Sequence, residues 1–562
     1  MLGAVQHLQI RGPLIEETGS LLLKEGFRLS GLALISFGAV QELKNSFVPS
    51  GRYKYFLEHV RANHVLDSFD VLILVPYFAI LIILAIFGLH RYHLVYLYLK
   101  NKHRKKTEPL ARFGQLPRVT VQLPIYNETF VVERLIDSVM RIDYPRELLE
   151  IQVLDDSTDE TRHIAQKKVE SFRKTGSDIH YIHRDNRAGF KAGALEEGLR
   201  VAQGEYIAIF DADFIPDPDF LNKTIHYFTE PNVGMVQTRW GHINREYSHL
   251  TQVEAMILDG HFVMEHGARS RSGRFFNFNG TAGIWRREAI EESGGWEHDT
   301  LTEDTDLSYR AQMKGWEFVY LPDVVSPAEL PVEMNGFKSQ QFRWAKGLVQ
   351  TGVKLLPRIF RSSLPWRIKT EAAFHLTANC SYPLMVLFCF ILLPAMIVRF
   401  YQGWFQMLYV DLPLFLAATM SVSSFYMISQ RELYPRTWWK TFKYLPFMMS
   451  LGIGLSVSNT RAVLEALFGI KTSFKRTPKY CVCSPGDVNL ARVKYRGKSG
   501  YTPYFELILG LYFTLSVLYA FSNENYPTLP FLLLFVVGFV YTGLMSLFQS
   551  TFHRFLKAKA TD

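Results

Sequence analysis

The sequence predicts an α/β domain with a largely parallel, doubly wound sheet, inserted between helices that span a membrane. Two observations lead to this fold class. Between residues 115 and 345, short apolar runs alternate with stretches of helical pattern, which is typical of parallel sheets covered by helices. On both sides of this segment the chain holds long uncharged runs, and about 20 apolar residues in succession are enough to cross a bilayer. The 48% hydrophobic content of the 562 residues fits a protein with both parts.

The elements of the α/β segment follow one another in a regular order. Its apolar runs are short, as expected for buried strands, and the stretches between them show helical periodicity. Ligands of such sheets bind beyond the carboxyl ends of the strands, so polar residues directly after a strand are candidate site residues. The expected order is strand 119–124, helix 128–141, strand 149–154, strand 179–183, helix 192–202 and strand 206–210.

Five membrane crossings are predicted. The first covers residues 69–99, where the uncharged run from Val71 to Leu89 is followed by a basic cluster. Residues 1–68 hold only a short apolar stretch and are interpreted as an interfacial segment of unassigned role. The other crossings lie within the region 372–562, at about 373–398, 412–429, 504–521 and 529–547.

Two further apolar segments are expected to lie along the membrane surface. Residues 346–371 mix apolar and basic side chains, as amphipathic interfacial helices do. The stretch 444–469 is long and apolar, but it contains Asn459, Arg461 and Glu465. Charged side chains are costly inside a bilayer, so we interpret this stretch as interfacial.

Basic residues are concentrated on one side of the predicted bundle. With five crossings, the loops 399–411 and 522–528 lie outside and carry one basic residue, Arg399, whereas the inside segments are rich in Lys and Arg. Such a bias marks the cytoplasmic side, so we expect a multi-pass integral membrane protein with a cytoplasmic α/β domain, in the plasma or inner membrane or in the Golgi. This bias explains much of the net charge of +9 and makes nucleic acid an unfavoured partner. Four cysteines supply no disulfide framework.

The Asp211-Ala212-Asp213 motif directly follows the apolar run 205–210. Its carboxylates therefore emerge where a buried strand meets solvent. Paired carboxylates hold Mg²⁺ or Mn²⁺ through oxygen and leave coordination positions for phosphates. The motif alone is also common in loops, but its strand context favours a metal site at Asp211 and Asp213.

A second acidic pair, Asp155-Asp156, follows the run 151–154. It is interpreted as a contact to a nucleotide, because a carboxylate accepts well from a base N–H or a ribose hydroxyl. The alternative is a helix N-cap. Lys191 stands in a glycine-containing segment at a helix start, where an anion is favoured; the alternative is a solvated surface lysine.

The motif Thr302-Glu303-Asp304 supplies the candidate general base. Asp304 is the preferred residue, because a carboxylate can take a proton from a sugar hydroxyl as a bond forms. Glu303 and Asp306 are alternatives for this role, and an N-cap is the structural alternative. The molecule that carries this hydroxyl, the acceptor, is expected to contact Thr302 and Glu303. It is also expected to contact Asn279 in the small-residue segment 278–283.

Gln340, Arg343 and Trp344 fall within two turns of one predicted helix. Arginine presents fixed donors that match a phosphate, and an indole face stacks on the apolar face of a sugar ring. The alternative is a Trp-Arg pair at the membrane interface.

Together these motifs resemble the membrane-integrated, inverting glycosyltransferases of family 2, which include cellulose, hyaluronan and chitin synthases. The strings Phe278 to Gly283, Gly294-Gly-Trp296 and Lys314-Gly-Trp316 look most like the cellulose-synthase-like branch with mannan and xyloglucan-backbone synthases. The resemblance implies a GT-A (Rossmann-like) fold for residues 115–345. It also implies that Asp155 and Asp156 contact the nucleotide, that Asp211 and Asp213 hold the metal and diphosphate, and that Asp304 contacts the acceptor, whose end of the site is lined by Gln340, Arg343 and Trp344. From their residue types, Lys191 and Arg343 are expected to stabilise the diphosphate of the nucleotide sugar.

Residues 470–484 are similar to the gating loop of bacterial cellulose synthase. Phe474, Thr477 and Lys479 match its Phe-x-Val-Thr-x-Lys pattern, whereas Arg476 replaces the usual valine. This replacement leaves the gating role open.

The function expected from the sequence is an inverting, processive glycosyltransferase that needs Mg²⁺ or Mn²⁺. It would polymerise a β-glucan from UDP-glucose and pass the growing polysaccharide across the bilayer. The alternatives are a mannan or glucomannan synthase using GDP-mannose, and a non-processive transferase that glycosylates a ceramide or polyprenyl-phosphate lipid. A scaffold built on an inactive transferase fold is disfavoured, because every expected catalytic position is filled. Accessory subunits and homo-oligomers stay open.

Overall fold

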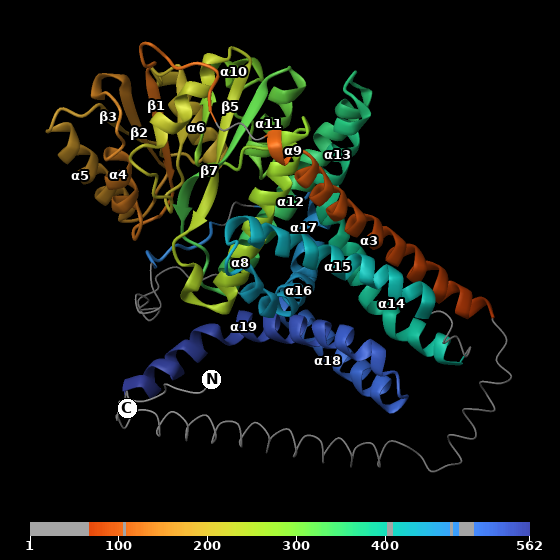
Figure 1. Cartoon of the computed structure of the whole chain (residues 1–562). Coiled ribbons are helices and arrows are strands. Elements are labelled where there is room, and N and C mark those ends of the chain that lie inside the picture. The colour runs from red at the N-terminus through yellow and green to blue at the C-terminus, as the bar shows by residue number, and fades with distance from the viewer. Residues whose placement is uncertain (1–66, 105–107, 402–407, 473–475, 483–499, 562) are drawn as a thin grey trace, which may run out of the picture.

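The computed structural model describes residues 67–104, 108–401, 408–472, 476–482 and 500–561 (Figure 1). The predicted interfacial segment 1–68 lies almost entirely outside these residues, as do Phe474 and much of the gating-like loop.

A seven-stranded sheet forms the centre of the α/β domain, with the strand order β3-β2-β1-β4-β6-β5-β7. β1, β2, β3 and β4 run parallel, and β7 is parallel to β5, but β6 is antiparallel to both β4 and β5. The sheet is therefore mixed, and the predicted α/β fold class is confirmed with one reversed strand. The strands are β1 Val119–Ile125, β2 Leu149–Asp155, β3 Ile179–His183, β4 Tyr206–Ile209, β5 Val233–His242, β6 Gly283–Arg286 and β7 Glu317–Ala328.

Apolar side chains cover both faces of this sheet, as a doubly wound fold requires. In β4, Ala208 joins one buried cluster, whereas Ile207 and Ile209 join the other, because successive side chains point to opposite faces. Burial of each large aliphatic side chain contributes about 1.5–3 kcal/mol. The covering helices are α4 Val132–Met140, α5 Thr161–Arg173, α6 Phe190–Val201, α7 Phe220–Thr224, α10 Arg287–Glu292 and α11 Glu303–Met313.

A helical rod, between β5 and β6 in the sequence, lies next to the long apolar helices. It consists of α8 (His249–Asp259), a π-helix (Gly260–His266) and α9 (Gly267–Arg271). α9 contacts α3, and α8 contacts α15, so the rod joins the sheet domain to the bundle (Figure 1).

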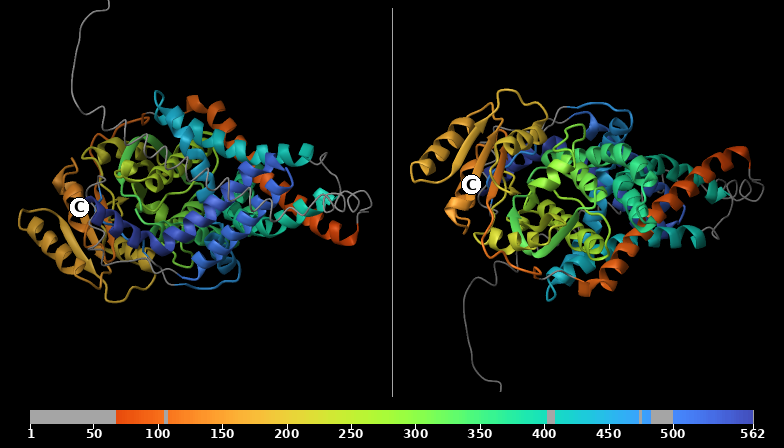
Figure 2. Two further views of the ribbon diagram at one scale, coloured as in Figure 1. Left: turned by 90° about the horizontal axis from the view of Figure 1, so that it is seen from below. Right: turned by 90° about the horizontal axis from the view of Figure 1, so that it is seen from above.

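Four helices of the described chain are long and apolar enough to cross a membrane: Ser68–Lys100, Trp366–Arg399, Thr502–Ser522 and Tyr526–Gln549. α15, which contains the predicted crossing 412–429, is a helix but is not among these four. The five-crossing topology stays a prediction. The long helices are α3 Ser68–Lys100, α14 Ser381–Tyr401, α15 Leu408–Leu433, α18 Thr502–Ser522 and α19 Leu529–Thr561. In Figures 1 and 2, α3 and α14 extend away from the sheet domain, whereas α19 runs back below it.

The segments expected at the membrane surface also form helices. Most of residues 346–371 belongs to α12 (Met334–Arg361), which includes the Gln-x-x-Arg-Trp motif, and to α13 (Trp366–Thr377), which continues towards α14. The stretch 444–469 is split into α16 (Leu445–Gly454) and α17 (Ser456–Leu467). α12 packs on α17 and thereby holds the sheet domain against the bundle.

Candidate active site

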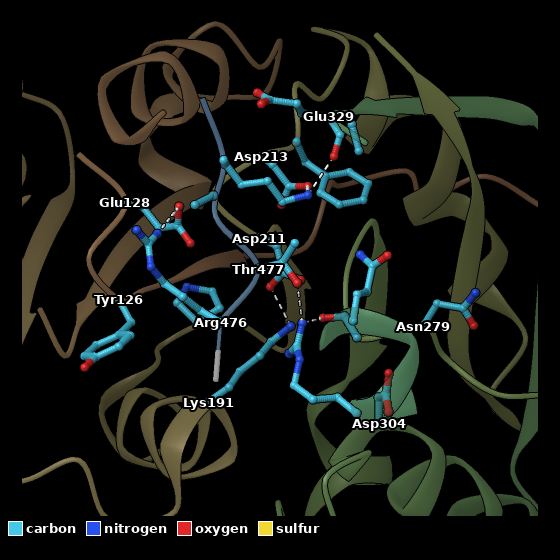
Figure 3. A pocket seen from close by; sticks show the side chains of 18 of the residues that line it. Tyr126, Glu128, Lys191, Asp211, Asp213, Asn279, Asp304, Glu329, Arg476 and Thr477 are labelled. Atoms are coloured by element: carbon cyan, nitrogen blue, oxygen red, sulfur yellow. Dashed lines mark hydrogen bonds and ion pairs between the residues drawn. The ribbon is translucent and has the colours of Figure 1, made fainter. Parts of the chain in front are cut away.

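A cavity of about 210 Å³ opens beyond the carboxyl ends of β1 and β4. Its walls come from these strand ends, from α6, α11 and α12, and from residues 476–479 (Figure 3). Most of the sequence-predicted site residues line it: Asp156, Lys191, Asp211, Asp213, Asn279, Thr302, Glu303, Asp304, Gln340, Arg343, Trp344, Thr477 and Lys479.

Asp155 stands apart from the other residues of the predicted nucleotide site. Its carboxylate is fully buried, is not part of the cavity lining, and accepts hydrogen bonds from Tyr181 Oη at 2.6 Å and from the Ser157 amide at 2.9 Å. As the last residue of β2, it points into the packed sheet and holds the neighbouring strand β3. Asp156, the next residue, points to the other side and does line the cavity.

Asp156 is held by Arg184, the residue directly after β3. Arg184 donates from Nε and Nη2 to the two carboxylate oxygens of Asp156, at 2.8 and 2.5 Å. Nearby, the Arg187 guanidinium lies 3.3 Å from the centre of the Tyr126 ring. Tyr126 and Arg187 both line the cavity but are absent from the sequence-based prediction. Tyr126 directly follows β1, a position of the same kind as the predicted aspartates.

The two aspartates after β4 each face a lysine. Lys191 Nζ donates to Asp211 Oδ1 at 2.5 Å and to the Gly280 carbonyl at 2.8 Å. Burial opposes the charge of Lys191 most strongly, but the Asp211 and Glu303 carboxylates outweigh it and raise the lysine pKa. Gly189, with a φ of 70°, caps α6 in a left-handed conformation and brings Lys191 to this place.

The second lysine comes from the described part of the gating-like loop. Lys479 Nζ lies 2.6 Å from Asp213 Oδ2. In the same loop Arg476 pairs with Glu128 at 2.8 Å, and Thr477 accepts a hydrogen bond from Arg343 at 2.9 Å (Figure 3). Burial raises the pKa of Glu128 to about 7 in spite of Arg476. The described loop residues Arg476, Thr477 and Lys479 thus line the cavity, and the two cations pair with its carboxylates.

Asp304 stands in the first turn of α11 and faces the cavity. Its Oδ1 accepts from the Thr305 amide at 2.7 Å. Burial, assisted by the neighbouring Glu303 charge, raises the pKa of Asp304 to about 7, which suits a general base near neutral pH. Across from it, a Cβ at Gly280 would lie only 3.0 Å from Asp304 Oδ2, so glycine keeps open the space beside this carboxylate.

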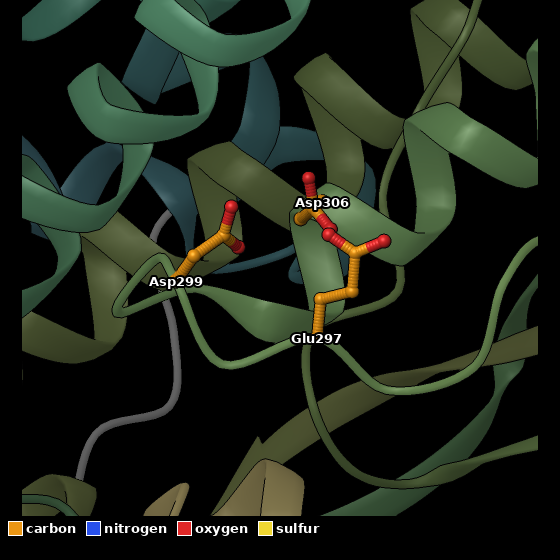
Figure 4. Close-up of side chains that lie close together, drawn as sticks. All are labelled: Glu297, Asp299 and Asp306. Carbon is orange, nitrogen blue, oxygen red and sulfur yellow. The ribbon is translucent and has the colours of Figure 1, made fainter.

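Asp306, an alternative for the general base, is turned away from the cavity. It is fully buried and pairs with Arg310 at 2.8 Å and with Lys354 at 2.9 Å. With Glu297 and Asp299 it forms a three-carboxylate group that sequence reasoning did not identify (Figure 4). Lys354 contacts all three residues, so an ammonium group already supplies the positive charge there.

Part of the cavity wall is aromatic. Gln340, Arg343 and Trp344 line the cavity from positions i, i+3 and i+4 of α12, and the charges of Glu303, Asp211 and Asp213 act on the Arg343 guanidinium. Trp344 and Trp240 both pack against the small buried cluster that includes Leu258 of α8, and they form an apolar part of the cavity wall. Burial lowers the pKa of Arg343 to about 10. Trp240 was not predicted, because it lies within a strand rather than after one.

A mixed, mainly parallel sheet with carboxylates grouped at its carboxyl edge and an Arg-Trp helix beside them defines a GT-A-like α/β domain. Residues 117–347 match the model of the family described as "Glycosyltransferase like family 2". This segment is a glycosyltransferase family 2 domain, and the resemblance to the cellulose-synthase-like branch is confirmed by the relatives that follow.

Two curated relatives illustrate the match. The probable glucomannan 4-beta-mannosyltransferase 7 of Oryza sativa subsp. japonica is 45% identical over 255 residues, which cover 43% of this chain and 44% of the relative. Glucomannan 4-beta-mannosyltransferase 2 of Arabidopsis thaliana is 42% identical over 273 residues, which cover 47% and 51%. The chain spans about half the length of the curated relatives it matches.

Among solved structures, the mannosyltransferase PcManGT from Pyrobaculum calidifontis, in complex with GDP-Man and Mn²⁺, aligns with a TM-score of 0.46 and 22% identity. The alignment covers 70% of this chain and 99% of that chain.

Proposed function

We propose that the protein is an inverting, divalent-metal-dependent glycosyltransferase that transfers mannose from GDP-mannose to a β-1,4-linked polysaccharide. The observation that carries this proposal is the meeting of Asp211, Asp213, Asp304 and Trp344 in one cavity. The sugar is suggested by the relatives, which are named glucomannan 4-beta-mannosyltransferases. They favour the mannan-synthase alternative over the β-glucan synthase that was our main interpretation of the sequence.

The chemistry of Asp211 and Asp213 fits a bound divalent cation. Both carboxylates line the cavity, and each now faces an ammonium group, so this wall already accommodates positive charge. Carboxylate oxygen is the ligand that Mg²⁺ and Mn²⁺ prefer. A cation held there would neutralise charge on the donor diphosphate.

The other residues of the cavity are assigned either to the nucleotide-sugar donor or to the acceptor. Asp156 and Tyr126 would hold the nucleoside, and Lys191 and Arg343 would place positive charge beside the diphosphate. Asp304 would take the proton of an acceptor hydroxyl while that oxygen bonds to the anomeric carbon from the face opposite the diphosphate. The bond from this carbon to the diphosphate oxygen breaks, and GDP leaves with the electron pair. The new linkage is therefore β.

The Trp344 surface would hold the end of the growing chain, and the membrane helices beyond it would carry the polysaccharide out of a cytoplasmic catalytic domain. α12 supports this assignment because it bears Trp344 and also packs on the bundle. Two buried ion pairs join α12 to bundle helices, Lys346 to Glu465 of α17 at 2.8 Å and Lys338 to Glu506 of α18 at 2.6 Å.

The direct test uses the full chain in detergent with radiolabelled GDP-mannose or UDP-glucose and Mg²⁺ or Mn²⁺. We expect a polymer from GDP-mannose that is degraded by an endo-β-1,4-mannanase. A polymer from UDP-glucose alone would restore the β-glucan interpretation, and a product with one added sugar would favour the non-processive alternative. No transfer from either donor would contradict the proposal.

A further inference from the structure

The π-helix Gly260–His266 lies between the cavity and the membrane helices. π-helices are rare and occur frequently at functional sites. This one packs tightly on α15, because a Cβ at Gly260 would come within 2.5 Å of the Tyr426 ring. Two of its residues, His261 and His266, stack edge to face with their ring centres 4.4 Å apart.

These two histidines hold the cavity segment Asn277–Gly280 at two points. His266 Nε2 donates to the Asn277 carbonyl at 2.9 Å, and burial keeps the pKa of His266 well below its usual value, so this ring is neutral. Asn277 Nδ2 donates to Asn279 Oδ1 at 2.7 Å. This bond orients the Asn279 amide, whose Nδ2 faces His261 Nε2 at 3.1 Å.

The hydrogen bond with Asn279 determines which ring nitrogen of His261 carries the hydrogen. Because Asn279 Nδ2 is a donor, His261 Nε2 must accept. The hydrogen is then on Nδ1, which donates to Glu265 Oε2 at 2.8 Å. His261 therefore uses one ring nitrogen for the cavity and the other for the π-helix carboxylate.

From Glu265 the polar contacts continue into helices of the bundle. Arg269, which is 2% exposed, lies 3.4 Å from Glu265 and 2.9 Å from Glu371 of α13. Glu371 in turn contacts His90 of α3 at 3.1 Å. Both α13 and α3 belong to candidate membrane spans. A continuous series of polar contacts therefore joins Asn279 in the cavity to the membrane helices.

The segment Asn277–Gly280 lies beside Lys191 and Asp304, two residues of the proposed reaction. Gly280, next to Asn279, accepts from Lys191 and lies against Asp304. A shift of Asn279 would therefore change the space beside the general base. Other contacts also anchor the domain to the bundle, among them the Lys346–Glu465 and Lys338–Glu506 ion pairs, so anchoring alone does not require His261 to face Asn279.

We propose that His261 is a positioning residue for the acceptor sugar. It fixes the Asn279 amide in the cavity, and the series Glu265, Arg269, Glu371 and His90 ties this amide to the membrane helices. One N–H of the Asn279 amide then serves His261, and the second is directed to a hydroxyl of the acceptor. The inference rests on the proposed function, because it assumes that this part of the cavity holds a sugar chain.

The test compares His261→Phe with His261→Gln in the full chain in detergent. Phenylalanine keeps the ring but removes the acceptor nitrogen, whereas the glutamine amide oxygen can still accept from Asn279. His249→Phe is the matched control, since His249 is exposed on the same helical rod and packs on Tyr444. Binding of mannohexaose and of GDP-mannose with Mn²⁺ is measured separately by calorimetry, followed by transfer kinetics.

For His261→Phe we expect mannohexaose Kd and acceptor KM to rise about tenfold, the scale of one hydrogen bond. The Kd of GDP-mannose should stay within about twofold of wild type. His261→Gln should restore most of the acceptor affinity, and His249→Phe should match wild type. Glu265→Gln, which removes the carboxylate partner of Nδ1, should show the same selective defect to a smaller degree.

Unchanged mannohexaose affinity in His261→Phe would overturn the positioning role. An equal loss of GDP-mannose affinity, or equal defects in the Phe and Gln variants, would also overturn it, because both indicate general misfolding. A wild-type chain that binds neither GDP-mannose nor mannohexaose would instead refute the proposed function. The two failures are therefore distinguishable.

Discussion

The carboxylates at the proposed donor end of the cavity have different neighbours from those at the proposed acceptor end. At the donor end each carboxylate faces a cation: Asp156 faces Arg184, Asp211 faces Lys191, Asp213 faces Lys479 and Glu128 faces Arg476. At the acceptor end Asp304 accepts from a backbone amide and stands beside another carboxylate, Glu303.

The difference follows from what each end has to do. Alternating charges at the donor end can be exchanged for a metal and a diphosphate without leaving a buried charge unpaired. A general base needs the opposite environment, because burial and a like charge raise its affinity for a proton. These surroundings fit the proposal that a single cavity would bind the metal and diphosphate in one part and accept the proton in another.

The largest expected effect comes from removing the base. Asp304→Asn should lower transfer by roughly 10²–10⁴, the usual contribution of a general acid–base group, and should leave GDP-mannose binding intact. Asp217→Asn, at an exposed position, is the control. Single-turnover transfer and calorimetry measure the two quantities. Near-normal transfer in Asp304→Asn would refute the assignment.

The second largest effect is expected from the loss of a proposed metal ligand. Asp213→Asn should lower transfer by roughly 10²–10³, as does the loss of one electrostatic contact to a developing charge, and should also weaken GDP-mannose binding. This double defect distinguishes it from Asp304→Asn. Addition of EDTA to wild type should reproduce the defect, with recovery on Mn²⁺. If donor affinity were the same with EDTA as with Mn²⁺, the metal assignment would be wrong.

The pH dependence tests the proposed role of Asp304 as the base. The pKa of Asp304 is raised to about 7, and the base must be unprotonated, so kcat/KM should be constant above pH 7 and fall about tenfold per pH unit below it. Glu128 also has a pKa raised to about 7, so the profile is repeated in Glu128→Gln. The acid limb should keep its midpoint in that variant. A flat profile down to pH 5 would contradict the role of Asp304.

The smallest expected effect is at the aromatic surface. Trp344→Ala should raise the acceptor KM roughly two- to tenfold, the scale of one aromatic contact, with donor KM unchanged. Trp439→Ala, at an exposed tryptophan, is the control. Initial rates at varied mannohexaose concentration measure the change. An effect on donor KM alone would assign Trp344 to the other end of the cavity.

Several features follow from the sequence because they depend on neighbouring residues. Strand β3 has the predicted bounds, and β1, β2 and β4 differ from them by one residue, because an apolar run between polar segments marks a buried strand. The aspartates after these runs lie at the carboxyl edge, because parallel strands end on the same side. Asp156, Asp211 and Asp213 therefore line one cavity, and Asp304 reaches the same cavity from the first turn of α11.

Other features were decided only by tertiary packing. Asp155 is buried under Tyr181, β6 enters the sheet in the reverse direction, and Lys479 reaches Asp213 from a loop far along the chain. The contacts from Asn279 to His90 likewise join a loop to four helices, the π-helix, α9, α13 and α3. Local patterns determine where a strand ends and which polar residues follow it. They do not contain the distances between segments that are remote in sequence, and those distances set each ion pair and each shifted pKa.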